Sequence, residues 1–349
     1  MATSTHPSRF WDGGATTWTD HPTPGLRLLS VRADGTTRLG APEPCGGNPT
    51  SGALLPSGNL LVVHELTDGQ ISLYSTGGDQ AILLNSAATH SADPTSVAVT
   101  KDGGHAFVAN YSGGALTVHR LTPLCVKDPL LKVQYEGNGP TERQRSPHPH
   151  QAVIDWEMGS VLVPDLGMDV VHVHLLEDLV NGVPNHHDIA LTPGCGPRHI
   201  ALTGLPADGL GQDTMLVACE LDNTVRAIDI ATGDELAVAK PTTATESLPS
   251  AIHVTSTGLV LVGNRGPDTI GILQWDEENG TLTYLGEETC GGKHPRDLAL
   301  TEDQKHVVVA NLKSDDVTIL ALDPAAATLQ LVGSIETCSP TALIPVERR

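Results

Sequence analysis

The feature that most constrains this sequence is an internal repeat marked by prolines. Seven prolines, each at the start of an apolar alternating stretch, recur at spacings of 45, 55, 48, 52, 46 and 45 residues: Pro49, Pro94, Pro149, Pro197, Pro249, Pro295 and Pro340. In each complete unit a second apolar stretch ends in a polar residue, as in His105-Ala-Phe-Val-Ala-Asn110. Units of this length, built from short alternating strands, are typical of the four-stranded blades of a β-propeller.

The number of blades follows from the two ends of the chain. Six units are complete, and a seventh begins at Pro340 but ends after a single strand. Strand-like segments at 25–31 and 36–39 can supply its missing strands, and pairing them would close the ring and remove exposed sheet edges. We therefore predict an all-β, seven-bladed β-propeller of four-stranded antiparallel blades, a single domain over residues 1–349 with residues 1–10 as a flexible tail. Six blades with a loose C-terminal tail is the alternative.

Composition limits the partners. The net charge of −21 disfavours binding to a phosphate backbone, and the sequence contains no apolar run of the roughly 18 residues that a membrane helix needs. Residues 1–10 lack the apolar segment of a signal peptide, and six scattered cysteines suit free thiols in a reducing compartment. We expect a cytoplasmic protein with no nucleic-acid or membrane partner. The oligomeric state stays open.

The repeat brings two sets of residues to one rim of the central channel, because the first strand of each blade leaves that rim and the second returns to it. The residues after the prolines are Thr50, Thr95, His150, Arg198, Ser250, Arg296 and Thr341. The residues that end the second strands are Glu65, Asn110, Asp165, Glu220, Asn264 and Asn311, with Arg265 following Asn264. Their chemistry differs from blade to blade, which favours a functional role. For Asn110 and Asn311, turn formation is an equally good explanation.

Three arginines on this rim, Arg198, Arg265 and Arg296, indicate an anion site in an otherwise acidic chain. The planar guanidinium group matches carboxylate and phosphate groups with paired hydrogen bonds. Salt bridges to Asp165, Glu220 or Asp297 would also explain the arginines, and the two explanations are compatible.

Seven segments on this rim carry a resemblance to a known family. They are Ala109-Asn-Tyr-Ser-Gly-Gly114, Gly137-Asn-Gly-Pro140 with Pro147-His-Pro-His-Gln151, Pro164-Asp-Leu-Gly167, Gly196-Pro-Arg-His199, Cys219-Glu-Leu221, Gly263-Asn-Arg-Gly266 and Gly291-Gly-Lys-His-Pro-Arg296. From about Asn48 onward the chain resembles the seven-bladed propeller lactonases, which include a bacterial type of 6-phosphogluconolactonase and the fungal 3-carboxy-cis,cis-muconate lactonizing enzyme. The segment Phe10-Trp-Asp-Gly-Gly14 departs from the Gly-Thr-Tyr type of opening strand expected for the family.

The resemblance implies a catalytic set of His150, Arg198, Glu220 and Arg265. The first hypothesis is hydrolysis of a lactone with an acidic substituent, such as a sugar lactone, without a cofactor. His150 would act as general base, the arginines would hold the anion and the developing oxyanion, and Glu220 would orient an arginine or supply a proton. The expected substrate-binding residues are Glu65, Asn110, Tyr111, His148, Asp165, His199, Asn264, Lys293, His294, Arg296 and Asn311.

Two further functions stay open. The same site could cyclise a carboxymuconate, so the expected ligand is a small anionic lactone or carboxylate. Alternatively the propeller could be a protein-binding platform, although Tyr111 is the one Phe, Trp or Tyr residue in the seven rim segments. The sequence has no G-x-S-x-G motif, which disfavours a serine hydrolase.

No metal site is expected. His148 and His150 form a pair without an evident third ligand, and the pairs His172/His174 and His186/His187 are expected on the solvated surface. The segment 137–147, with Arg143 and Arg145, either lies over the pore or is mobile.

Overall fold

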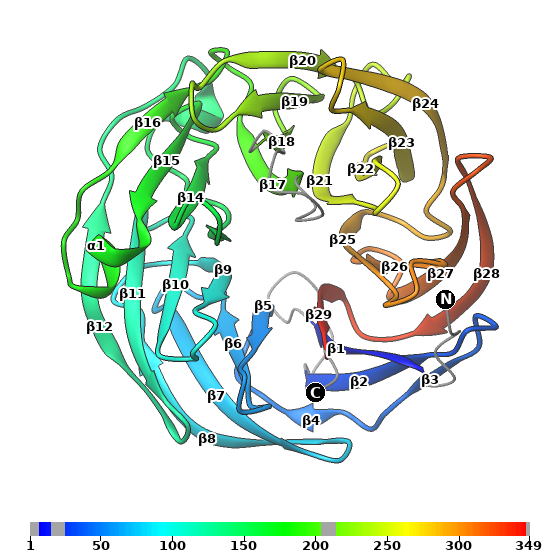
Figure 1. The fold of residues 1–349 in the computed structure, drawn as a ribbon. Coiled ribbons are helices and arrows are strands. Elements are labelled where there is room, and N and C mark those ends of the chain that lie inside the picture. Colours follow the sequence, from blue (N-terminus) through cyan, green and yellow to red (C-terminus); the bar gives the residue numbers. More distant parts are fainter. Residues whose placement is uncertain (1–6, 15–24, 204–213, 347–349) are drawn as a thin grey trace.

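The computed structural model describes residues 7–14, 25–203 and 214–346, and these form seven antiparallel sheets around a central space (Figure 1). The predicted all-β, seven-bladed propeller is confirmed. Helix within the described residues is limited to α1 (Leu176–Val180) and a 3-10 turn at Glu142–Gln144. In the same part of the chain, no helix has the length and apolar character needed to cross a membrane.

The blades share one strand order from the centre outward. The innermost strands are β5 (Pro49–Leu54), β9 (Pro94–Val99), β13 (Val153–Asp155), β17 (Pro197–Thr203), β21 (Leu248–Val254), β25 (Pro295–Leu300) and β29 (Pro340–Pro345). The second strands are β6 (Leu60–His64), β10 (His105–Asn110), β14 (Ser160–Asp165), β18 (Thr214–Cys219), β22 (Leu259–Arg265), β26 (His306–Asn311) and β1 (Ser8–Gly14).

The third strands are β7 (Gln70–Gly77), β11 (Ala115–Thr122), β15 (Val170–Leu175), β19 (Thr224–Asp229), β23 (Thr269–Asp276), β27 (Asp316–Asp323) and β2 (Gly25–Val31). The outer strands are β8 (Gln80–Ala88), β12 (Cys125–Gln134), β16 (His187–Ala190), β20 (Glu235–Ala239), β24 (Thr281–Thr289), β28 (Thr328–Glu336) and, in the closing blade, β3 (Thr37–Leu39). A short strand, β4 (Glu43–Pro44), also pairs with β2.

The ring closes as predicted, by pairing of strands from the two ends of the chain. β1 lies between β29 and β2, with Trp11 opposite Ile344 on one side and opposite Leu28 on the other. The expectation of a flexible tail over residues 1–10 is wrong for residues 8–10, which belong to β1 because both of its edges are paired. Residues 1–6 lie outside the described part.

The apolar cores lie between neighbouring blades. In one cluster, for example, Leu162 and Val173 of the β13–β16 blade pack against Met215 and Ile228 of the next blade. Alternating strands supply such faces on both sides of every sheet, because successive side chains point to opposite faces. Each blade is therefore held by its two neighbours.

The residues after the prolines connect the blades around the channel. In most blades the pairing register shifts just after the proline, as between Pro49 and Ser51, so that one extra residue bulges out of the ladder. The residue after the proline is Ser or Thr in four of the seven blades, and its hydroxyl donates to a backbone carbonyl in the inner segment of the next blade. The bonds run from Thr50 to Pro94, from Thr95 to His150, from Ser250 to Pro295 and from Thr341 to Pro49, over 2.7–3.4 Å.

Candidate active site

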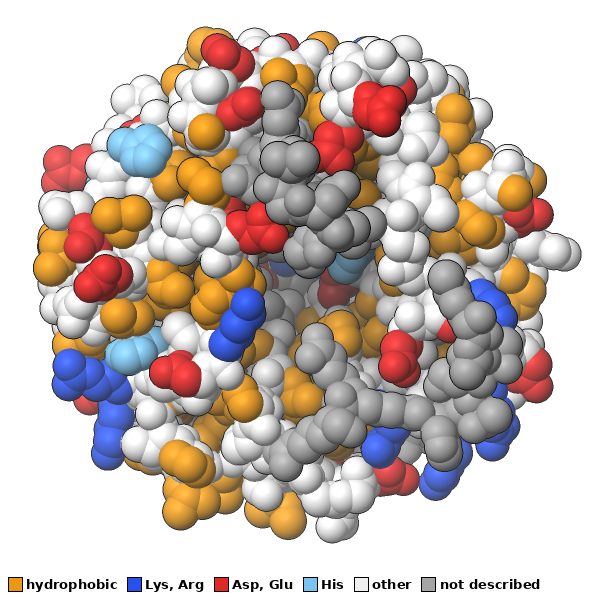
Figure 2. All heavy atoms as spheres, in the orientation of Figure 1, with side chains coloured by type: hydrophobic (Ala, Val, Ile, Leu, Met, Phe, Trp, Pro, Cys, Tyr) orange, Lys and Arg blue, Asp and Glu red, His pale blue; other side chains and the backbone are white. Residues whose placement is uncertain are grey.

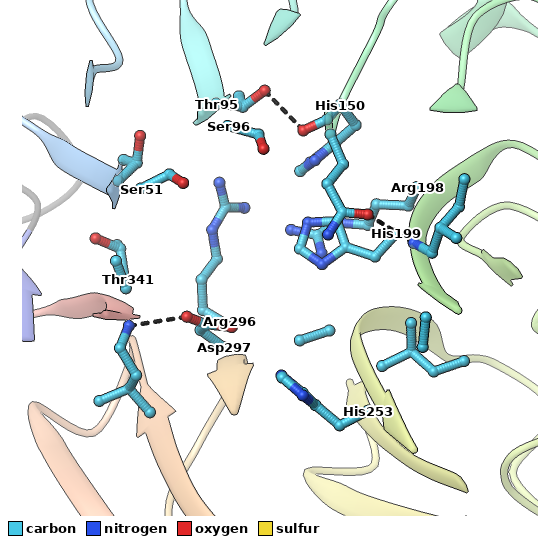
Figure 3. Close-up of a pocket in the computed structure, with 18 of the residues that line it drawn as sticks. Ser51, Thr95, Ser96, His150, Arg198, His199, His253, Arg296, Asp297 and Thr341 are labelled. Carbon is cyan, nitrogen blue, oxygen red and sulfur yellow. Dashed lines mark hydrogen bonds between the residues drawn. The ribbon is translucent and has the colours of Figure 1, made fainter. Parts of the chain in front are cut away.

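A cavity of about 370 Å³ occupies the channel and is lined by the inner segment of every blade. Figure 2 shows the hollow at the centre of one face. Polar side chains from three blades, Arg198, His199, His253, Arg296 and Asp297, line it together with His150 of a fourth. Figure 3 shows Arg296 extending into this cavity. The three positions after a proline that lack a hydroxyl, His150, Arg198 and Arg296, therefore add an imidazole and two guanidinium groups to the cavity wall.

Glu220 is the centre of an arginine cluster at the rim of this cavity. Its Oε2 lies 3.2 Å from Nε of Arg198 and 2.5 Å from Nη2 of Arg265, and its Oε1 lies 2.9 Å from Nη2 of Arg143. Glu220 and Arg198 are almost fully buried, whereas the Arg143 side chain is half exposed. Although burial opposes ionisation, the arginines lower the pKa of Glu220 to about 2, so this carboxylate is ionised at neutral pH.

Positive charge exceeds negative charge in this cluster. The fourth arginine, Arg296, lies 3.5 Å from Oε2 of Glu65. Burial lowers the pKa of Arg198, and the neighbouring Arg265 and Arg296 lower it further. Among the described residues, Nη1 of Arg198 has no hydrogen-bond partner. A buried donor without a partner is costly, so an anionic ligand at this position would relieve both the repulsion and the unmet hydrogen bond.

His150 is held neutral beside the arginines. Burial lowers its pKa well below the usual histidine value, and the nearby charge of Arg198 adds to the effect. Its ring makes edge contacts with Tyr111 and His199, at centroid distances of 5.6 and 5.1 Å. Within the described part of the chain, Nδ1 of His150 lacks a hydrogen-bond partner. The imidazole is therefore a neutral group that is positioned by packing.

Hydrogen bonds of Gln144 anchor segment 137–147 at the rim, which favours the expected position over the pore. The buried Gln144 donates to the carbonyl of Leu166 at 2.9 Å and to Oδ1 of Asp169 at 2.7 Å. This anchor places Arg143 against Glu220 and 3.3 Å from the Tyr111 hydroxyl. Arg143 is thus a site residue that was not among the predicted set, and the signal for it was the pair of arginines in a segment that could lie over the pore.

Tyr111 and His148 form a flat aromatic surface beside this arginine. Their rings are stacked with centroids 4.4 Å apart, and Nδ1 of His148 lies 3.1 Å from the carbonyl oxygen of Tyr111. The structure therefore brings these two predicted residues together next to His150.

Other predicted site residues are engaged within their own blades. Asn110 donates to Val108 and Ala115, Asn264 to Pro241, and Asn311 to Thr318. These bonds hold the three side-chain amides in place through their donor groups. Oδ1 of Asp165 accepts from the backbone amides of His148 and Gly167. Lys293 is exposed, and the pKa of His294 is lowered to about 3 by burial and by Arg265.

Two titratable residues of the cavity wall were not predicted for the site, and one prediction about the surface is wrong. His253 and Asp297 line the cavity, and Asp297 accepts from the backbone amide of Leu343 at 2.8 Å (Figure 3). His172 and His174 are buried rather than solvated, because the ring of Tyr135 packs over them.

Comparisons with known proteins identify the family of this chain. Residues 15–345 match the family described as "Lactonase, 7-bladed beta-propeller". A 6-phosphogluconolactonase of Bacillus subtilis is 30% identical over 301 residues, which are 82% of this chain and 84% of that protein. A 6-phosphogluconolactonase of Formosa agariphila is 28% identical over 79% of this chain and 82% of its own length.

Solved structures have the same fold. A Bacteroides fragilis protein superposes with a TM-score of 0.87 and 25% identity over 99% of this chain and 100% of that one. The Pseudomonas aeruginosa periplasmic gluconolactonase gives a TM-score of 0.84 at 23% identity, over 98% and 99%. The names of these relatives give no support to the muconate alternative. This chain belongs to the seven-bladed β-propeller lactonase family.

Proposed function

We propose that the protein hydrolyses a lactone with an anionic substituent, such as a phosphorylated sugar lactone. The observation that carries the proposal is the cluster of Arg143, Arg198 and Arg265 on a single carboxylate, next to the neutral imidazole of His150. The relatives from B. subtilis and F. agariphila are named for a phosphorylated lactone, which agrees with an anion site of this kind. No cofactor is required, because the lactone carbonyl is already electrophilic.

In the proposed reaction His150 takes a proton from water as the oxygen of that water attacks the lactone carbonyl carbon. The low pKa of His150 keeps the base form fully populated near neutral pH, and it makes the resulting imidazolium a ready proton donor. When the tetrahedral intermediate collapses, the ring C–O bond breaks and the leaving alkoxide takes that proton back. One residue thus serves both proton transfers.

The arginines have two tasks in this scheme. Nη1 of Arg198 is a buried donor in the cavity wall and would bond the oxygen that becomes negative in the tetrahedral intermediate. Arg143, Arg265 and Arg296 would hold the anionic substituent.

Glu220 fits one of its two predicted roles better than the other. A carboxyl whose pKa is about 2 is an ionised acceptor at neutral pH, so we assign it the orientation of Arg198 and Arg265.

We also propose that the protein is located in the cytoplasm, because its six scattered cysteines suit free thiols in a reducing compartment. Cell fractionation tests this location.

The test uses a panel of lactones and one variant. Turnover by the purified chain is measured on a phosphorylated sugar lactone, on its unphosphorylated counterpart and on a carboxymuconate, with thermal melting as the check of folding. We expect preference for the phosphorylated lactone, and a fall in kcat of roughly 10²- to 10⁴-fold in His150→Ala. His187→Ala, at an exposed histidine, is the matched control. A folded His150→Ala protein with unchanged kcat would refute the assignment.

A further inference from the structure

A second group of titratable side chains lies away from the channel, on the β13–β16 blade. It consists of His172 on β15, Asp188 on β16 and His186 just before β16. One nitrogen from each imidazole and one carboxylate oxygen lie within 4.8 Å of one another. We propose that these three residues bind a divalent zinc ion.

The ligand atoms are close to the spacing that zinc requires. Zinc bonds of about 2.0–2.1 Å to nitrogen and oxygen, arranged as a tetrahedron, put neighbouring ligand atoms about 3.3 Å apart. Oδ1 of Asp188 lies 2.7 Å from Nδ1 of His172 and 3.7 Å from Nε2 of His186. Asp188 and His186 are partly exposed, so small movements of their side chains can equalise these distances.

The sheet register fixes the first two ligands. His172 and Asp188 are direct partners across the antiparallel pair of β15 and β16, so their side chains lie on the same face. The buried Asp165 accepts from the other ring nitrogen, Nε2 of His172, at 3.4 Å. Such a carboxylate behind a ligating histidine fixes its tautomer and ring orientation, and it is a regular feature of zinc sites.

Aromatic packing and two hydrogen bonds position the His172 ring and the backbone next to His186. The ring of Tyr135 stacks on His172 at a centroid distance of 3.7 Å, and its hydroxyl lies 2.8 Å from Nε2 of His174. Nδ1 of His174 in turn lies 3.0 Å from the carbonyl oxygen of Asn185, the residue before His186. The buried His174 thus holds the backbone next to the third ligand.

The donor set selects the type of metal. Two imidazoles and one carboxylate suit zinc and its neighbours in the first transition row, whereas calcium and magnesium prefer oxygen ligands. Three protein ligands leave a fourth position for water. The ion would tie the segment that follows α1 to the adjoining strand β15, so its expected effect is on stability.

The test measures metal binding directly and needs no substrate. The full chain, free of affinity tags, is treated with EDTA, desalted and titrated with zinc chloride by calorimetry. We expect one equivalent of zinc per chain and a higher Tm in the presence of zinc. Cobalt(II) in place of zinc should give the visible absorption bands of a tetrahedral complex.

Variants at the two partly exposed ligands locate the site. His186→Ala and Asp188→Asn should abolish the calorimetric binding and the rise in Tm, while their melting without metal stays close to that of the parent chain. His187→Ala, at the neighbouring exposed histidine, should bind as the parent does. Absence of stoichiometric binding in the parent chain, or equal binding in all three variants, would overturn the proposal. Neither result depends on lactonase activity.

Discussion

At the scale of single residues, the candidate site is organised by an imbalance of charge. One buried carboxylate, Glu220, contacts three guanidinium groups, and a neutral imidazole stands beside them. An anion in the cavity would add the missing negative charge where the dielectric is low, and there charge-assisted hydrogen bonds are strongest. Arg143 is the member of this group that a substrate reaches most easily, since half of its side chain is exposed.

Arg143→Ala should therefore weaken binding of an anionic lactone more than binding of a neutral one. A lost hydrogen bond to a charged group costs about 1.5–3 kcal/mol, which corresponds to an increase in KM of roughly 10- to 100-fold for the phosphorylated substrate. Steady-state kinetics on the matched pair of lactones measures the effect. Arg145→Ala in the same segment is the control, because Arg145 pairs with the exposed Glu142. Equal changes for both lactones would show that Arg143 contacts no anion.

At the scale of the elements, the position after the proline has two roles: in some blades it bonds to the next blade, and in others it supplies a side chain to the cavity. A hydroxyl after the proline bonds to the next blade in four blades, and the other three carry His150, Arg198 and Arg296. At these three positions the side chain serves the cavity in place of the hydroxyl bond to the next blade.

In the closing blade, the contribution of such a hydroxyl bond to stability can be tested at Thr341. The hydroxyl of Thr341 donates to the carbonyls of Pro49 and Gly13, at 3.1 and 3.0 Å. Thr341→Val keeps the shape but leaves two buried acceptors without this donor, so the free energy of unfolding should fall by about 1–3 kcal/mol. Thr341→Ser retains the hydroxyl and should stay within about 1 kcal/mol of the parent in chemical denaturation. Equal losses in both variants would indicate that methyl packing matters and the hydrogen bond does not.

Much of this layout could be predicted from the sequence, because strand period and proline spacing are local signals. The bulge after each proline is not local, and it decides which side chains reach the cavity. His253 was missed for this reason: the register shift between Pro249 and Ile252 changes which residues of β21 face the channel. Similarly, the sequence placed Asn110 correctly at the end of β10 but could not show that its amide bonds back to Val108 and Ala115.

At the scale of the whole molecule, the ring depends on one blade made from both ends of the chain. Asp12 lies in the middle of β1, fully buried between β29 and β2. Its Oδ2 accepts from the Thr337 hydroxyl at 2.7 Å, and burial raises its pKa from 3.8 to about 7. The segment 10–14, which departs from the family's opening strand, therefore contains a carboxyl group that binds its proton more tightly in the folded chain than in the unfolded chain.

The free energy of unfolding should consequently fall as pH rises. Between pH about 4 and about 7 the unfolded chain has lost the proton of Asp12 while the folded chain retains it, so stability falls by about 1.4 kcal/mol per pH unit and then levels off. Asp12→Asn lacks this titration and keeps an acceptor for Thr337. Its Tm relative to that of the parent should therefore increase from pH 5 to pH 8. Asp234→Asn, at an exposed turn, should run parallel to the parent. A constant difference between Asp12→Asn and the parent would contradict the raised pKa.

Closure by strands from the two ends also sets an order of events during translation. The ribosome makes β1 before β29, and Thr341 emerges 328 positions after Gly13, the residue that its hydroxyl bonds. Until then the nascent chain has an unpaired β1 edge and a channel that lacks the wall formed by Thr341, Ala342, Leu343 and Ile344. Exposed strand edges of this kind invite pairing with other chains. The interval between the synthesis of β1 and that of β29 is therefore the period in which this protein is most exposed to aggregation and has no complete substrate cavity.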